Sequence, residues 1–324
     1  MGDLTAIVLA AGAGTRMKSA TAKVLHAIGG RSMVGHVLAA VNQLGAERVI
    51  VVVGHQRDQV RPHIEAIAPQ TLFAVQTEQL GTGHAARVAV DAAQDASTGT
   101  VLVLYADTPL LEAESLTALV DHHRETGAAV TVMTGVVEDP FGYGRIVRDA
   151  TGAVVAIVEQ KDADEEQRTI QEINSGIFAF DAAFLTAVLP RLGNNNAAGE
   201  YYLTDVVAAA RAEGLGVEGF QISDVMQTEG VNDRVQLAAL GAELNRRVVT
   251  RWMRSGVSMV DPDSTWIDVT ARLASDVTIA GPSHLLGDTQ VDSGAVIGPY
   301  AVISNAHIRS GEVVPPFTTI GPRA

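Results

Sequence analysis

An aliphatic residue recurs every six positions near the end of the chain, and this repeat constrains the fold more than any other sequence feature. The spacing of six holds without a break from the first member to the seventh, and it resumes after one step of five. The repeated positions are Ile267, Leu273, Ile279, Leu285, Val291, Ile297, Ile303, Ile308, Val314 and Ile320. This period is typical of a hexapeptide β-helix, in which three hexapeptides form one triangular coil and the aliphatic side chains stack inside. The sequence therefore predicts a short β-helix of about three coils.

The part of the chain before residue 233 has a different pattern, in which short apolar runs alternate with helical stretches. Helices are expected at 33–44 and 83–93. Apolar runs that read as strands lie at 5–10, 48–53, 100–104 and 130–133. Fully apolar strands that alternate with helices predict an α/β fold with a Rossmann-like, mostly parallel sheet covered on both faces. In such sheets, ligands bind beyond the carboxyl ends of the strands.

A long helix is expected between these two parts, over residues 233–255. Apolar residues from Val235 to Trp252 recur there at helical spacing, and Gly256 is a suitable C-terminal end. The predicted domains are therefore an α/β domain at 1–233, a linker helix at 234–256 and a short left-handed β-helix at 257–324.

Charge and composition exclude several classes of protein. The net charge of −14 disfavours nucleic acid as a partner, because phosphate backbones attract Lys and Arg. The chain contains no cysteine, so disulfides and thiolate chemistry are excluded. No signal peptide is visible, and no apolar stretch approaches the ~18 residues of a membrane span. These features predict a cytoplasmic enzyme without membrane contact.

A glycine-containing turn follows the first predicted strand, with the sequence LAAGAGTRM at residues 9–17. Small residues allow close approach of a ligand to the backbone, and the amides of such a turn can cradle phosphates. By itself a G-x-G turn is a weak signal. Two cations beside it, Arg16 in the turn and Lys23 shortly after, make a phosphate site more specific.

This turn and its downstream lysine resemble the signature of nucleoside-triphosphate:sugar-phosphate nucleotidyltransferases. The family pattern usually has proline before the lysine, whereas this chain has Ala22 before Lys23. The cation itself is present. The resemblance implies phosphate contacts from Lys23 and from the turn residues Leu9, Ala10, Ala11, Gly12 and Gly14.

A second motif, QTEQLGTGHA at residues 76–85, resembles the uracil-reading loop of N-acetylglucosamine-1-phosphate uridyltransferases, the N-terminal part of a bifunctional bacterial enzyme family. Gln76 can offer a donor and an acceptor to a base edge, and Gly81 permits close stacking. Thr82 can start the following helix and also contact the base. The resemblance places Gln76, Gln79, Gly81 and Thr82 in the nucleotide site.

Asp107 follows the third predicted strand, where a carboxylate is well placed for a ligand in an open α/β sheet. Aspartate is a hard oxygen ligand suited to Mg²⁺. The family usually has glycine before this aspartate, and here the residue is Ala106. The resemblance implies that Asp107 and Asn232 hold Mg²⁺, which is the cofactor expected for this chain.

Further motifs follow in the order of the same family. They are FGYGRI at 141–146, IVEQKDA at 157–163, INSGI at 173–177, NNNAAGEYYLTD at 194–205 and GVNDR at 230–234. The sugar contacts that the resemblance implies are Tyr105, Gly144, Glu159, Asn174 and Asn232. It covers the whole N-terminal two-thirds of the chain.

The reaction that the resemblance implies is attack of N-acetylglucosamine 1-phosphate on the α-phosphorus of UTP. Two anions must meet, so neutralisation of charge is the main catalytic task. Mg²⁺ would bridge the attacking phosphate and the α-phosphate, while Arg16 and Lys23 would bind the leaving pyrophosphate. With Asp107, these cations form the expected catalytic set. The product would serve the synthesis of cell-wall peptidoglycan.

The predicted β-helix is shorter than in the bifunctional enzymes. Family members use further coils for the acetyltransferase site, so acetyl transfer is expected to be absent from this chain. Left-handed β-helices of the family assemble as trimers. Whether this short β-helix self-associates stays open. It also stays open whether the chain is a truncated form or a naturally short homologue.

Three alternatives stay open. A related pyrophosphorylase could use another sugar 1-phosphate or dTTP, although the motifs at 76–85 and 194–205 favour uracil and an N-acetyl sugar. A non-catalytic nucleotide-sugar-binding protein would be expected to lack the metal pair or the cations. Acyl transfer by the β-helix alone is disfavoured by the missing residues.

Overall fold

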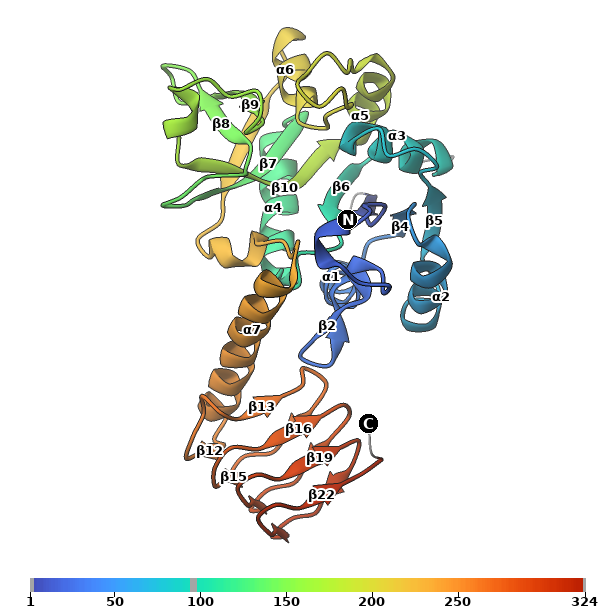
Figure 1. Cartoon of the computed structure of the whole chain (residues 1–324). Helices are drawn as coiled ribbons and strands as arrows, with labels where there is room; N and C mark the ends of the chain where they lie inside the picture. Colours follow the sequence, from blue (N-terminus) through green and yellow to red (C-terminus); the bar gives the residue numbers. More distant parts are fainter. Residues whose placement is uncertain (1–2, 94–97, 323–324) are drawn as a thin grey trace. The chain divides into compact units, whose positions relative to one another are not determined.

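The computed structural model describes residues 3–93 and 98–322, and these form two compact units (Figure 1). The first unit comprises Met1–His26 and Met33–Asp233, and the second comprises Ala27–Ser32 and Arg234–Ala324. The sequence predicts that Ala27–Ser32 belongs to the first domain, whereas the structure assigns this segment to the second unit. The segment forms a two-stranded hairpin of β2 (Ala27–Ile28) and β3 (Arg31–Ser32).

The first unit is built on a nine-stranded, mostly parallel sheet, as the sequence predicts. Its main path has the order β11-β7-β10-β6-β1-β4-β5, and β8 and β9 extend from β10. Strand β10 runs antiparallel to β6 and β7. The strands are β1 (Leu4–Leu9), β4 (Arg48–Val53), β5 (Leu72–Val75), β6 (Thr100–Tyr105), β7 (Val130–Val136), β8 (Arg145–Arg148), β9 (Val154–Val158), β10 (Glu172–Asp181) and β11 (Val217–Gln221).

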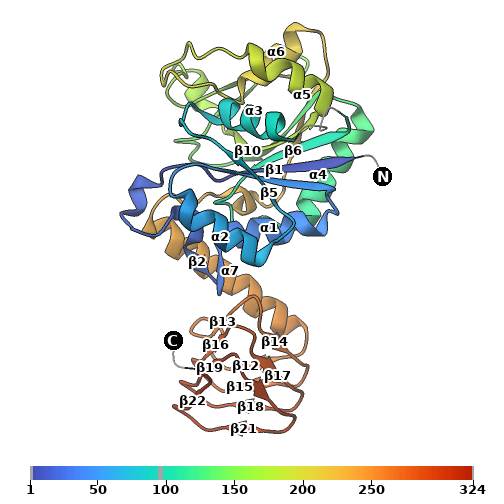
Figure 2. The same cartoon turned by 90° about the vertical axis from the view of Figure 1, so that its right-hand side faces the viewer.

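Helices cover both faces of this sheet because successive strand residues point to opposite sides. In β1, Ile7 packs with the core under α3, α5 and α6, whereas Val8 packs with the core under α1, α2 and α4. Figure 2 shows the two groups of helices on opposite faces. The helices are α1 (Met33–Gln43), α2 (Arg57–Ile67), α3 (Thr82–Ala92), α4 (Ala113–Thr126), α5 (Ala182–Val188) and α6 (Asp205–Ala212).

The strand order reverses at β1, and this reversal positions the candidate site. From β1 the chain continues to β4 and β5 on one side and then returns to β6 on the other side. Leu9 and Tyr105 are paired at the carboxyl ends of β1 and β6. The glycine-containing turn and Asp107 therefore leave the sheet side by side, at the type of position where open α/β sheets bind ligands.

The second unit contains the predicted linker helix, α7 (Arg234–Arg254), and the hexapeptide β-helix (Figure 1). The short strands stack in three faces, with the orders β12-β15-β18-β21, β13-β16-β19-β22 and β14-β17-β20. They are β12 (Ser258–Met259), β13 (Trp266–Ile267), β14 (Arg272–Leu273), β15 (Thr278–Ile279), β16 (His284–Leu286), β17 (Gln290–Val291), β18 (Val296–Ile297), β19 (Val302–Ser304), β20 (His307–Ile308), β21 (Val313–Val314) and β22 (Thr319–Ile320).

The repeated aliphatic residues form the interior of this β-helix, which confirms the interpretation of the six-residue period. Each of them from Ile267 to Val314 is buried, and Ile320 is partly buried. Val248 and Val249 of α7 join the same core. One residue of the helical pattern behaves differently, because Val235 is exposed at the start of α7.

No helix within residues 3–93 and 98–322 combines the length and the apolarity needed to cross a membrane.

A charge cluster on α7 yields a stability prediction. The Glu243 carboxylate accepts hydrogen bonds of 2.7 Å from Arg246 and Arg247. The bond from Arg246, with that from Arg247, lowers the pKa of Glu243 to about 2. Because the folded pKa lies below the ordinary value, this stabilisation is complete above about pH 4.5 and is lost as the pH falls toward 2.

We therefore expect Glu243→Gln to lower the free energy of unfolding of the second unit by about 1 kcal/mol at pH 7, a typical upper value for exposed pairs. The difference from wild type should shrink as the pH falls below 4.5. Both tryptophans of the chain, Trp252 and Trp266, lie in this unit, so urea titrations followed by tryptophan fluorescence at pH 7 and pH 3.5 measure the change. An equal difference at both pH values would contradict it.

Candidate active site

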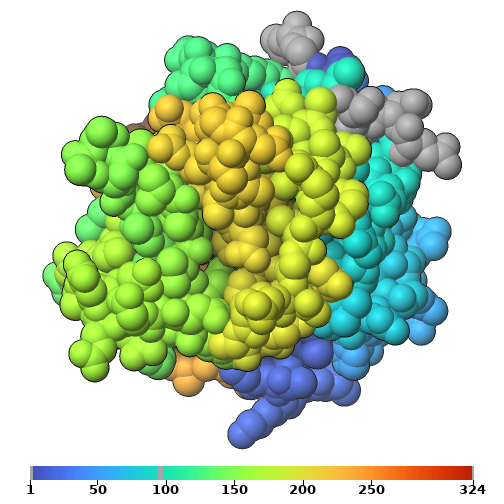
Figure 3. Space-filling model, turned by 90° about the horizontal axis from the view of Figure 1, so that it is seen from above, coloured from blue at the N-terminus to red at the C-terminus, as the bar shows by residue number. Residues whose placement is uncertain are grey.

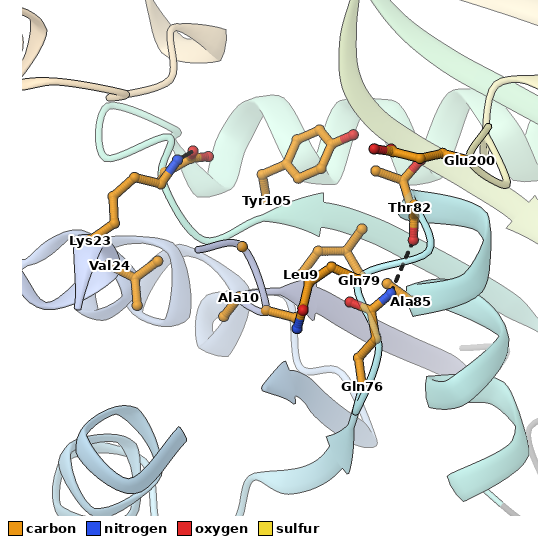
Figure 4. Close-up of a pocket in the computed structure, with 14 residues that line it drawn as sticks. Leu9, Ala10, Lys23, Val24, Gln76, Gln79, Thr82, Ala85, Tyr105 and Glu200 are labelled. Atoms are coloured by element: carbon orange, nitrogen blue, oxygen red, sulfur yellow. Dashed lines mark hydrogen bonds and ion pairs between the residues drawn. The ribbon is translucent and has the colours of Figure 1, made fainter. Parts of the chain in front are cut away.

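A pocket of about 290 Å³ opens at the carboxyl ends of β1 and β6 (Figure 4). It brings together the glycine-containing turn, Lys23, the 76–85 loop and the end of β6. The residues that line it are Leu9, Ala10, Ala11, Gly12, Lys23, Val24, Gln76, Gln79, Gly81, Thr82, Ala85, Tyr105, Asp107 and Glu200. Most of the nucleotide residues predicted from the sequence thus share one cavity.

The turn after β1 approaches the chain around Lys23 closely. Gly14 has a φ of +59°, a conformation that favours glycine, and a Cβ atom there would lie 2.6 Å from Cβ of Lys23. Gly12, in contrast, faces open space, because a Cβ atom added there would have no other atom within 4 Å. The turn therefore presents bare backbone to the pocket at Gly12, while Gly14 lets Lys23 reach the same end of the cavity.

Two cation–oxygen pairs join the four residues that were predicted to act on phosphate and metal. Lys23 Nζ lies 2.5 Å from Asp107 Oδ2, and both side chains are largely buried. Arg16 Nη2 donates to Asn232 Oδ1 at 2.8 Å and is exposed. Asn232 is held near Asp107 by the main chain, since Val231 N donates to Asp107 O at 3.0 Å. The four side chains thus gather at one end of the site.

The donor set at this end fits a hard divalent cation that is shared with a substrate. Within the described ranges, no cluster of three or more His, Cys, Asp or Glu residues could hold a metal ion alone. Asp107 and Asn232 offer one carboxylate and one amide oxygen on adjoining segments. Mg²⁺ is commonly bound by one or two carboxylates together with phosphates and water, so this sparse set suits it.

The 76–85 loop forms the opposite end of the pocket from Lys23, as Figure 4 shows. Gln76 is buried, and its amide nitrogen lies 3.1 Å from both Gly81 O and His84 Nδ1. These two contacts orient the side-chain oxygen of Gln76 as the acceptor that remains for a base edge. His84 thus helps to orient the Gln76 side chain.

A distant segment closes over this loop and explains its glycine. Tyr201 N donates to Leu80 O at 2.8 Å, and Gly83 N donates to Tyr201 O at 2.7 Å. Gly81 has a φ of +107°, and a Cβ atom there would lie 2.6 Å from Tyr201 O. Any larger residue would push the two segments apart. Thr82 begins α3, and its hydroxyl accepts a bond of 3.0 Å from Leu203 N.

Tyr105 lies between the two ends of the pocket (Figure 4) and depends on a glycine that sequence reasoning missed. A Cβ atom at Gly176 would lie 2.0 Å from the Tyr105 ring. The register of β10 shifts between Asn174 and Phe178, and the Asn174 Oδ1 atom accepts from Gly176 N at 2.9 Å. A glycine inside an apolar strand pattern signals such a bulge, but it does not reveal which ring fills the space.

Three of the predicted sugar residues, Gly144, Glu159 and Asn174, lie outside the residues that line the 290 Å³ cavity. A Cβ atom at Gly144 would lie 3.4 Å from both carboxylate oxygens of Glu159, and Asn174 N donates to Gly144 O at 2.9 Å. These contacts bring Gly144, Glu159 and Asn174 near one another. Burial raises the pKa of Tyr105, as do the charges of Glu159 and Asp107, so its phenol stays neutral.

Glu159 is a carboxylate whose pKa is raised. Burial raises its pKa, although a hydrogen bond of 3.2 Å from the Thr204 hydroxyl opposes the shift. Figure 3 shows the green region of β8 and β9 beside the gold region of α6 at the surface, and α6 packs on β9. Glu159 directly follows β9, and its partner Thr204 directly precedes α6.

Three lining residues were not predicted from the sequence, namely Val24, Ala85 and Glu200. Ala85 stands in the 76–85 motif, one turn into α3, and Glu200 stands in the 194–205 motif. Their motifs pointed to the site, but side-chain direction decides which members of a motif face it. Val24 follows Lys23 in a short 3₁₀ helix, Lys23–Leu25, and no sequence signal marks it.

Comparison with known proteins gives a consistent result. Residues 6–173 match the family described as MobA-like NTP transferase domain. The chain is 52% identical over 294 residues to the bifunctional protein GlmU of Thermobifida fusca, covering 90% of this chain and 61% of that protein. It is 51% identical over 297 residues to the bifunctional protein GlmU of Cutibacterium acnes, covering 90% of this chain and 71% of that protein. The chain thus spans roughly 60 to 70% of the length of these relatives.

Proposed function

Because the chain belongs to the family of bifunctional GlmU proteins and contains a MobA-like NTP transferase domain, we propose that it is a UDP-N-acetylglucosamine pyrophosphorylase. It transfers the uridylyl group of UTP to N-acetylglucosamine 1-phosphate and releases pyrophosphate. The reaction depends on Mg²⁺ and takes place in the cytoplasm, where it supplies a precursor of the cell wall.

The observation that carries this proposal is the arrangement of one cavity between two chemically different ends. One end holds Lys23 beside Asp107, which suits phosphates and a metal. The other end holds the buried Gln76 amide, in a loop where Gly81 lets the backbone pack closely against Tyr201. Tyr105 lies between them, next to Glu159. A nucleotide with its base at one end and its phosphates at the other fits this polarity.

Charge neutralisation is the chemistry that these residues perform. Lys23 and Arg16 bind the β- and γ-phosphates and offset the negative charge that develops on the leaving pyrophosphate. The amides of the turn at Gly12 hold the phosphate chain in line. No general base is required, because the phosphate nucleophile of the sugar is already ionised.

The metal complements these cations. Asp107 and Asn232 would hold it, and it would supply a Lewis acid shared by the two reacting phosphates. In the structure the same two oxygen ligands are paired with Lys23 and Arg16. With UTP bound, Lys23 and Arg16 would contact its phosphates, and Asp107 and Asn232 would then be available to hold the metal.

A pyrophosphate-release assay tests the function directly. The protein is assayed with UTP, dTTP, CTP and ATP against N-acetylglucosamine 1-phosphate, glucosamine 1-phosphate and glucose 1-phosphate in Mg²⁺. We expect UTP with the N-acetyl sugar to give the highest kcat/KM, because the methyl group of thymine would meet the narrow loop at Gly81. Comparable kcat/KM for dTTP would favour a thymidylyltransferase, and no turnover with any pair would favour a binding protein.

The raised pKa of Glu159 gives a pH prediction for sugar binding. As a carboxylate, Glu159 accepts hydrogen bonds from sugar hydroxyls, and its raised pKa means that it becomes neutral at a higher pH than an ordinary glutamate. The affinity for UDP-N-acetylglucosamine should therefore fall as the pH is lowered from 8 toward 5. In Glu159→Gln the affinity should be about tenfold weaker at pH 8 and nearly independent of pH.

Isothermal titration calorimetry measures this dependence, and the product is the better ligand because its diphosphate does not titrate in this range. Glu166→Gln, an exposed substitution in the same acidic stretch, serves as the matched control and should follow wild type. Parallel pH profiles for wild type and Glu159→Gln would remove Glu159 from the sugar site.

A further inference from the structure

One hydrogen bond joins the sugar loop at 141–145 to the segment that carries the metal ligand Asn232. The Tyr143 hydroxyl donates to Glu229 Oε2 at 2.9 Å, across 86 positions of the sequence. Neither residue lines the pocket, and neither has a role in the chemistry proposed above. The position of this bond between the two functional segments calls for an explanation.

The backbone around Tyr143 is held by hydrogen bonds to neighbouring side chains. Arg145 is 1% exposed, and its guanidinium donates to Tyr143 O and, at 2.7 Å, to Gln160 Oε1. Gly142 N donates to the same Gln160 oxygen at 3.1 Å. Two peptide groups of the loop, one on each side of Tyr143, are thus linked to Gln160, either directly or through Arg145. Any shift of the sugar loop must move the Tyr143 side chain with it.

The glutamate end leads directly to the metal ligands. A Cβ atom at Gly230 would lie only 3.7 Å from the Asp107 carboxyl carbon, so the chain after Glu229 runs against Asp107. Val231 N then donates to Asp107 O at 3.0 Å, and Asn232 follows. A displacement of Glu229 is transmitted over three residues to the side chain that completes the metal pair.

The chemistry of the pair favours a persistent bond. Burial and the hydrogen bond to Glu229 raise the pKa of Tyr143, so its hydroxyl remains a neutral donor at physiological pH. A phenol that donates to a carboxylate forms a charge-assisted bond, which is stronger than a bond between neutral groups. Tyr143 is half-buried, so water competes only weakly for the carboxylate.

We propose that Tyr143 is a positioning residue that couples occupancy of the sugar loop to the divalent metal site, by holding Glu229 and thereby Asn232 beside Asp107. The sugar is expected to press on the loop at Gly144, directly after Tyr143. Sugar binding then stabilises the conformation in which Asn232 faces the metal, and metal binding stabilises the loop in return. The coupling rests on the function proposed above.

Linkage makes this coupling measurable without turnover, because the metal and the sugar nucleotide must strengthen each other's binding by the same factor. The experiment measures the Kd of UDP-N-acetylglucosamine by calorimetry in MgCl₂ and in EDTA at equal ionic strength. For wild type we expect binding to be about tenfold tighter with Mg²⁺, within the usual range of coupling. In Tyr143→Phe the ratio should fall below about threefold, with the Kd in EDTA changed by less than about twofold.

Two further variants separate positioning from a general structural role. Glu229→Gln keeps an oxygen that accepts the Tyr143 hydrogen bond and should retain most of the Mg²⁺ ratio, whereas Glu229→Ala should lose it. Tyr300→Phe, a matched substitution at an exposed site of the β-helix, should leave the ratio unchanged. A merely structural role for Tyr143 would weaken binding equally in both buffers and leave the ratio intact.

The outcomes distinguish this inference from the proposed function. If wild type binds UDP-N-acetylglucosamine and Tyr143→Phe keeps the full Mg²⁺ ratio, the coupling is refuted while the function stands. A wild-type ratio of one also refutes it. If wild type binds the sugar nucleotide in neither buffer, the proposed function falls, and the coupling falls with it.

Discussion

Replacing Asp107 with Asn is expected to reduce kcat/KM for uridylyl transfer by about 10³-fold or more, while the fold is retained. The substitution keeps the shape of the side chain but removes the only carboxylate that the proposed metal site contains. Removal of one preorganised electrostatic group commonly costs about 10²–10³ in rate, and here both the metal and the orientation of Lys23 are lost. The side chain of Asp107 is 19% exposed at the pocket and is not part of the apolar core, so unfolding is not the cause.

The assay is pyrophosphate release at saturating UTP and sugar phosphate over a series of Mg²⁺ concentrations. Asp58→Asn is a matched control, because its carboxylate is 99% exposed on α2. It should retain wild-type activity. Activity of Asp107→Asn within tenfold of wild type at high Mg²⁺ would remove Asp107 from the metal site. Thermal melting of each variant confirms that the comparison concerns folded protein.

The parts of the fold that sequence predicts best are those in which each position repeats one local rule. The six-residue period identifies the buried positions from Ile267 to Val314, because every coil places the same residue inside. The apolar run at β4 likewise gives its bounds, Arg48–Val53, without adjustment. In both cases the burial of one side chain does not depend on a distant partner, so the local pattern is sufficient.

Features that depend on contacts between distant segments were not visible in the sequence. The hairpin at Ala27–Ser32 belongs to the second unit, although its pattern carries no sign of the excursion. Gly176 is required by the Tyr105 ring, which comes from another strand. Leu80 and Tyr201 pair across more than a hundred positions and close the 76–85 loop. Each of these facts concerns two segments, whereas a motif describes one.

The candidate site could be predicted from the sequence only in part. Motif resemblance identified residues such as Lys23 and Gln76, and the structure places both on one pocket. It did not indicate that Lys23 pairs with Asp107, or that Arg16 pairs with Asn232. A cation attracts nearby oxygen atoms that carry negative charge, so the pairing follows from electrostatics once the fold brings these residues together.

The second large effect is expected from the cations. Lys23→Ala and Arg16→Ala should each lower kcat about 10²- to 10³-fold, as is typical for groups that stabilise charge in phosphoryl transfer. Both cations are assigned to the β- and γ-phosphates of UTP. Because UDP-N-acetylglucosamine has no such leaving group, its Kd should change much less than kcat does.

The two variants are also expected to differ from each other. Lys23→Ala leaves Asp107 without its partner at 2.5 Å, so the free carboxylate should bind Mg²⁺ more readily in the absence of nucleotide. Arg16 is exposed and contacts the amide Asn232, so its loss should alter metal binding less. Calorimetric titration with MnCl₂, used as a substitute for Mg²⁺, measures this difference in metal affinity independently of turnover.

Single-turnover rates and calorimetric affinities for UDP-N-acetylglucosamine complete the test, with Arg57→Ala as the control because this arginine is 54% exposed on α2. A loss of product affinity as large as the loss of kcat would place the cations beside the sugar diphosphate instead of the leaving group. A kcat within a few-fold of wild type for both variants would leave charge neutralisation to the metal alone. The predicted pattern, slow chemistry with nearly intact product binding, arises only if Lys23 and Arg16 act on the pyrophosphate as it departs.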